Sequence, residues 1–157
     1  MFDTILGLPL HPLVVHAVVV LGPLAALCLL SYAAVPRWRL GLRWPTTLLA
    51  VISAGSAFVA KEAGEALERI RGAQPGFDHA ERGDLAFISL LVLLVATLLV
   101  VFVLARPGAS AARVPLALLV ALAAAGFAVV AIALAGHTGS QSVWSATAAA
   151  ITTTTTT

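Results

Sequence analysis

The chain has 157 residues, of which 61% are hydrophobic and only 10% are charged. A typical soluble domain is about 45–50% apolar and about 25% charged. This composition excludes an ordinary soluble enzyme and a disordered segment, and the nine basic residues are too scattered for a nucleic-acid-binding face. One cysteine, Cys28, excludes a disulfide framework. The sequence therefore predicts a small membrane protein embedded in the lipid bilayer.

Three apolar segments exceed the run of about 18 uncharged residues that crosses a bilayer. A fourth is apolar over residues 45–60 and continues without a helix breaker into a charged stretch that ends at Arg71, so we read it as one long helix that leaves the membrane. We predict helices over residues 12–35, 46–71, 79–105 and 114–137. Because the connections between them are short, consecutive helices are expected to lie antiparallel. The predicted fold is an all-α membrane protein, a four-transmembrane-helix up-down bundle that forms one domain over residues 1–151. Residues 152–157 are threonines, a low-complexity tail.

Opposite charges lie at opposite ends of this predicted bundle. The loops before the second and fourth helices hold arginines and no acidic residue: Arg37, Arg39, Arg43, Arg106 and Arg113. All seven acidic residues fall at the other end. The positive-inside rule then predicts that the arginine loops are cytoplasmic and that both termini lie on the non-cytoplasmic side.

All four histidines lie at the end opposite the arginines: His11, His16, His79 and His137. Histidine is rare in membrane segments and usually faces the protein interior or an aqueous path. Counting from the arginine end puts His16 about 30 Å up the first helix and His137 about 34 Å up the fourth, nearly level. His11 and His79 form a second, shallower pair. His11 and His16 are about 140° apart around a helix, so one metal is not expected to bind both.

Two imidazoles on different helices of a bundle are typical ligands of a b-type haem. We therefore expect a membrane-embedded electron-transfer subunit that binds haem b near the outer leaflet. His16 and His137 are the predicted axial pair. His79 competes for either position, and His11 belongs to a second site if the chain holds two haems rather than one.

Two alternatives remain open from the sequence. The chain is a cofactor-free structural or accessory subunit, with histidines at interfaces to other subunits, or it holds an outer copper or zinc ion. His16, His137, His79 and Glu65 are the candidate ligands of such a metal. A single methionine, Met1, argues against a copper-transport path. None of these functions needs catalytic residues, and we predict none.

Two local patterns concern the second helix. Lys61 and Glu65 are four residues apart and are expected to form an ion pair. Ser56, Ala60 and Gly64 follow each other at four-residue spacing, which is typical of a face that lets a neighbouring helix come close.

The opening segment LPLHPLVVHAVVVLGPLAALCLL resembles a widespread bacterial family of small four-helix membrane proteins of unknown function, whose members begin with an HPLxVH motif. The segment FDHAERGDL and the ending GHTGSQSVW are similar to later motifs of that family, although Ser140 stands where a second glycine is usual. The resemblance covers most of the chain and implies a bacterial inner-membrane protein. Relatives of the family occur with Rieske and cytochrome modules, which implies partner subunits of a respiratory or related redox complex.

Overall fold

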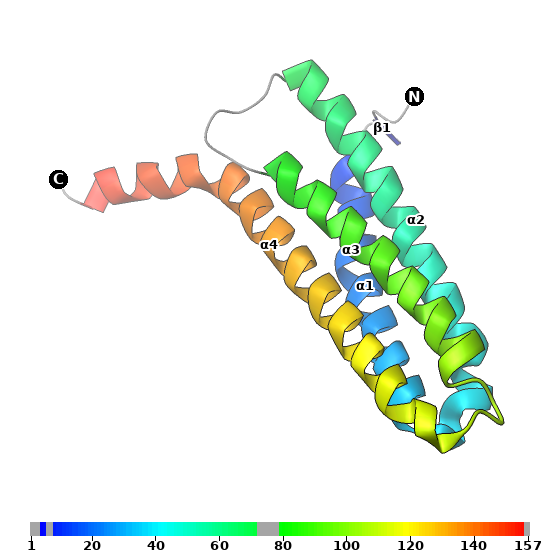
Figure 1. Ribbon diagram of the computed structural model, residues 1–157. Helices are drawn as coiled ribbons and strands as arrows, with labels where there is room; N and C mark the ends of the chain where they lie inside the picture. Colours follow the sequence, from blue (N-terminus) through cyan, green and yellow to red (C-terminus); the bar gives the residue numbers. More distant parts are fainter. Residues whose placement is uncertain (1–3, 6–7, 72–78, 156–157) are drawn as a thin grey trace.

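The computed structural model describes residues 4–5, 8–71 and 79–155 and has four long helices among them (Figure 1). These are α1 (Leu10–Ala34), α2 (Arg39–Arg71), α3 (His79–Leu99) and α4 (Val114–Thr155). Two short antiparallel strands, β1 (Thr4–Ile5) and β2 (Leu8–Pro9), precede α1. All four helices are long and apolar enough to cross a membrane, which confirms the predicted all-α four-helix membrane fold.

The helices form a closed ring in which each one packs against two neighbours. Consecutive helices contact each other, and α4 also packs along α1. The closing contact depends on Gly22, because a Cβ atom there would lie 2.5 Å from Ile132 Cδ1 on α4 and 3.3 Å from Leu90 Cδ2 on α3. A glycine at this position lets three helices approach closely in the middle of the bundle.

The structure starts α2 at Arg39, earlier than the predicted start near residue 46. The predicted loop is mostly helical, because a short 3₁₀-helix, η1 (Pro36–Trp38), leads directly into α2. The guanidinium of Arg39 is buried and donates hydrogen bonds to the carbonyl groups of Tyr32, at 3.3 Å, and Ala33, at 3.1 Å. These bonds satisfy carbonyl groups at the C-terminus of α1, and the chain turns without a longer loop.

The fourth helix also exceeds its prediction, since α4 continues past residue 137 to Thr155. Gly136 and Gly139 stand near the predicted end, but a glycine inside a helix costs only about 1 kcal/mol. No proline follows them, and alanines favour helix further on. Towards its C-terminus α4 bends away from the other three helices (Figure 1). Most of the threonine tail is therefore helical, and residues 156–157 lie outside the described residues.

A change of helix type closes the arginine end of the bundle. After α3 the chain forms a π-helix, η2 (Val100–Leu104), in which the Ala105 amide donates to the Val100 carbonyl at 2.8 Å. In an α-helix that amide would bond to the carbonyl of Val101 instead. The Val101 carbonyl instead accepts a hydrogen bond from the fully buried Tyr32 of α1. The Tyr32 hydroxyl is shared between the carbonyl groups of Val101 and Ala105, each at 3.2 Å.

The connection to α4 is a tight turn at Arg106–Ala109. The Ala109 amide donates to the Arg106 carbonyl at 2.9 Å. Gly108 has φ 81°, a left-handed conformation that favours glycine. A short 3₁₀-helix, η3 (Ala111–Arg113), then leads into α4. This turn brings Arg106 and Arg113 to the same end of the bundle as the arginines between α1 and α2.

Candidate functional site

Polar side chains from all four helices lie at one level near the end opposite the arginines. Gly22, Leu90 and Ile132 share one height, since they lie next to each other. At 1.5 Å per residue, His16, Asp84 and His137 lie about 8 to 9 Å beyond that height. On α2, Lys61 reaches the same level, because its Nζ is 3.0 Å from Oδ1 of Asp84. We call His16, Lys61, Asp84 and His137 the histidine layer.

The histidine layer lies at one boundary of the membrane. From Asp84 to Arg106 the chain rises by about 33 Å, which is close to the ~30 Å thickness of a bilayer's hydrocarbon core. The residues between these two levels on α3 are uncharged. The layer and the arginines therefore mark the two faces of the bilayer, and the predicted equal height of His16 and His137 agrees with the packing of α1 on α4.

The rings of His16 and His137 point outward from the bundle. Both residues are exposed. On α1, His16 lies about 120° around the helix from Gly22, which faces α4. On α4, His137 lies about 180° from the fully buried Ala128. Their helices are neighbours, but both rings lie on outer faces of the bundle, and the binding of one haem by this pair stays a prediction.

Two of the histidines are oriented by backbone carbonyl groups. Nδ1 of His11 lies 2.8 Å from the carbonyl oxygen of Ala60 on α2, and Nδ1 of His16 bonds to the carbonyl oxygen of Pro12. A carbonyl oxygen only accepts, so Nδ1 carries the proton in both rings. The neutral form of each ring then has its lone pair on Nε2. Histidines that bind metals through Nε2 are oriented in this way.

The two histidines of the predicted shallower pair, His11 and His79, differ in what surrounds them. His11 is half-buried, and its ring packs against Gly64, where a Cβ atom would lie 3.0 Å from the ring's Cε1. The predicted small-residue face of α2 thus accepts this ring. His79 is the first residue of α3. Its side chain lies outside the described residues, so the shallow pair of His11 with His79 stays a prediction.

An ion-pair cluster on α2 and α3 completes the site. Lys61 pairs with Glu65, as predicted, and also with Asp84 on the next helix. The sequence spacing predicts the first pair, but it carries no signal for the second, which depends on how α2 and α3 pack. Among the residues that the structure describes, no three His, Cys, Asp or Glu side chains are grouped closely enough to hold a metal ion.

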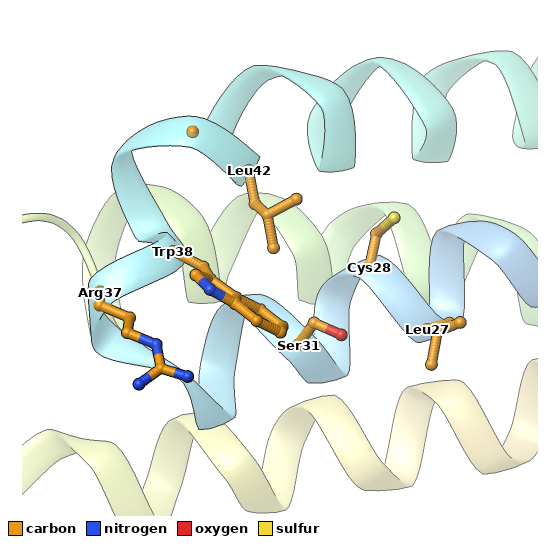
Figure 2. Close-up of a pocket in the computed structure, with 7 residues that line it drawn as sticks. Leu27, Cys28, Ser31, Arg37, Trp38 and Leu42 are labelled. Atoms are coloured by element: carbon orange, nitrogen blue, oxygen red, sulfur yellow. The ribbon is translucent and has the colours of Figure 1, made fainter.

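A second candidate site lies at the arginine end. A shallow groove of about 500 Å³ is lined by the last turns of α1, by η1 and by the start of α2 (Figure 2). Its lining residues are Leu27, Cys28, Ser31, Arg37, Trp38, Gly41 and Leu42. It combines one cation and one hydroxyl with apolar side chains, so its chemistry suits an amphiphilic molecule.

Comparison with known proteins adds one finding. The family described as "Predicted membrane protein (DUF2231)" matches residues 7–152. The match includes all four histidines and the arginine loops. No curated protein and no solved structure matches the chain.

Proposed function

The chain belongs to this DUF2231 family of predicted membrane proteins, and from that premise we propose that it is an accessory subunit of a larger membrane complex. The observation that carries this proposal is the outward direction of His16 and His137. Ionisable side chains within or near a membrane usually face the protein's own interior or a water-filled path. Two imidazoles on neighbouring helices that instead face away from the bundle, at one height, fit a contact with another subunit.

The course of α4 supports the same proposal. Its C-terminal part leaves the bundle (Figure 1), and the chain has no charged residue after Arg113. An uncharged helix that runs past its own bundle offers a second surface to a partner. The resemblance to a family with relatives near Rieske and cytochrome modules is the reason to propose a respiratory or related redox complex.

This proposal is tested on the complex as it exists in the membrane. We expect the chain, extracted in a mild detergent, to migrate on native gels in an assembly larger than its own 16.1 kDa plus detergent. The double variant His16→Ala/His137→Ala should shift most of the chain to the free form. The matched control Val19→Ala/Leu119→Ala changes outward apolar residues of the same two helices and should leave the assembly intact. A wild-type chain that is entirely monomeric would contradict the proposal.

A second proposal is that the complex holds haem b with an imidazole ligand from this chain. The observation that favours it is the bond between His16 Nδ1 and the Pro12 carbonyl, which leaves Nε2 as the ligating atom. Since His16 and His137 face outward, the second axial ligand of each would come from another chain. A b-type haem supplies one-electron transfer, and the role of this chain would be to hold and orient the ligating ring. Copper or zinc is the weaker form of this proposal, because no three-residue ligand set is grouped among the described side chains.

The haem proposal has its own readout. A reduced-minus-oxidised spectrum of the isolated complex, with a pyridine haemochrome on the same sample, should contain the α band of haem b. His16→Ala should reduce that band, whereas Val19→Ala, at another exposed position of α1, should not. If no α or Soret band exists in any oxidation state, the haem proposal fails and the native-gel result still decides the accessory role.

The orientation is proposed from the arginines, with the arginine end in the cytoplasm of a bacterial inner membrane. In a Cys28→Ser chain, we expect Ser110→Cys to react with a membrane-impermeant maleimide only after the cells are opened. Gln141→Cys, an exposed position at the opposite end, should react in cells whose outer membrane alone is permeabilised. The reverse pattern would invert the orientation.

A further inference from the structure

The groove at the arginine end has an apolar side and a charged edge. Figure 2 shows the Trp38 indole lying across it, with Leu42 and Cys28 beyond the ring and the Arg37 guanidinium near the ring. The groove is open rather than enclosed, and position 41 leaves space in it, since a Cβ atom at Gly41 would meet nothing within 4 Å. Its lining can therefore contact a chain-like apolar group without any rearrangement.

An exposed apolar stripe extends from the groove towards the centre of the membrane. Leu27, Leu24 and Val20 are 59%, 42% and 62% exposed. Together with Ser31 they are spaced at intervals of three or four residues along α1, so the four side chains share one face of the helix. The groove and this stripe together form a continuous path from the membrane boundary into the hydrocarbon region.

Arg37 carries a charge that the described chain does not neutralise. Among the described residues, Arg37 makes no ion pair, and its Cζ atom lies over the Trp38 ring, 5.7 Å from the ring centroid. The neighbouring arginines are engaged otherwise, since Arg39 bonds to carbonyl groups of α1 and Arg43 lies 4.8 Å from the centroid of Phe102. The sequence has no acidic residue between Asp3 and Glu62 or after Asp84, so an anion that pairs with Arg37 comes from outside this part of the chain.

We propose that this groove binds an anionic phospholipid. The phosphate of the headgroup pairs with Arg37, and one acyl chain follows Leu27, Leu24 and Val20. Charge complementarity selects the anionic headgroup, because basic side chains at the membrane surface attract anionic lipids. The apolar stripe selects a lipid over a free phosphate. This site lies at the other membrane face from the histidine layer, so it does not depend on the accessory or haem proposals.

The test compares two lipids on the full chain in detergent. Phosphatidylglycerol and phosphatidylcholine with the same acyl chains are added, and retained lipid is counted by native mass spectrometry. We expect phosphatidylglycerol to be retained in preference. Arg37→Gln should weaken that preference about fivefold, the effect of one basic side chain near the surface. Arg106→Gln removes an exposed arginine at the same end but outside the groove, and it should change the preference clearly less than Arg37→Gln does, because salt screens a charge that is not next to the bound phosphate.

A second variant separates the groove from general surface charge. Gly41→Leu places a side chain in open space and should reduce retention of phosphatidylglycerol while the protein stays folded, because leucine is also the better helix former. Equal retention of the two lipids, or equal effects of Arg37→Gln and Arg106→Gln, would overturn the proposal. So would full competition by glycerol phosphate, since the acyl chain would then contribute nothing.

Discussion

The two ends of the bundle use the same helices in different ways. At the arginine end, Tyr32 and Arg39 are buried and their side chains bond to backbone carbonyl groups of η2 and α1. At the other end, His16 and His137 are exposed, and Lys61 holds α2 to α3 through a partly exposed ion pair with Asp84. One end therefore fixes the geometry of the helices, and the other presents polar groups outward. This difference predicts that substitutions at the arginine end affect stability most.

The largest effect is expected for Tyr32→Phe. Removing the hydroxyl leaves the carbonyl groups of Val101 and Ala105 without its hydrogen bond, which costs about 2 kcal/mol. The matched control is Thr46→Val, because the Thr46 hydroxyl is also fully buried but has no hydrogen-bond partner among the described residues. Unfolding in mixed micelles should show a clear loss for the first variant and no loss for the second. Equal losses of unfolding free energy in the two variants would mean that the Tyr32 hydrogen bonds do not stabilise the arginine end.

A smaller effect is expected where His11 packs on α2. Alanine in place of a helical glycine normally gains up to about 1 kcal/mol, and Gly55→Ala should show this gain because its Cβ position is open. At Gly64 the new Cβ would press on the His11 ring, which the Ala60 carbonyl holds in place. We therefore expect Gly64→Ala to be about 1 kcal/mol less stable than Gly55→Ala. Identical stabilities in the same unfolding assay would show that the ring moves aside freely.

The smallest effect is expected for the exposed ion pairs. Lys61→Gln removes both pairs and should lower the unfolding midpoint slightly at low ionic strength, with a difference that shrinks near 1 M salt, where the Debye length is only about 3 Å. Glu62→Gln is the control, because no ion pair of Glu62 is present in the described residues. A salt-independent loss for Lys61→Gln would point to packing by its aliphatic stem instead.

The sequence predicts what depends on composition and spacing along one helix. Four spans, their antiparallel order, the separation of arginines from carboxylates and the Lys61–Glu65 pair all follow from such patterns. The rotation of each helix depends on packing between helices, and for this reason the outward direction of His16 and His137 was not predicted. A signal does exist on α4, where the small residues Ala117, Ala121, Ala124 and Ala128 recur at three- or four-residue intervals and are all buried. His137 lies opposite that face.

The bond of Asp84 to Lys61, the start of α2 and the end of α4 were missed for related reasons. The first depends on two helices at once. The second depends on Arg39, whose burial against the end of α1 turns a predicted surface loop into a helix. The third depends on how little a glycine weakens a helix when no proline follows it. Each of these features is decided by competition between interactions rather than by one residue type.

The π-helix at Val100–Leu104 has hydrogen bonds that span five residues instead of the four of an α-helix, so it accommodates one extra residue. The extra residue therefore sets the angle, around the helix axis, between the buried face of α3 and the point at which the Arg106–Ala109 turn leaves the helix. Deleting a single residue here would restore regular winding and rotate everything that follows by about 100° relative to α3. An insertion or deletion within Val100–Leu104 would therefore change the direction in which α4 packs against α1, although no residue of α4 or α1 is altered.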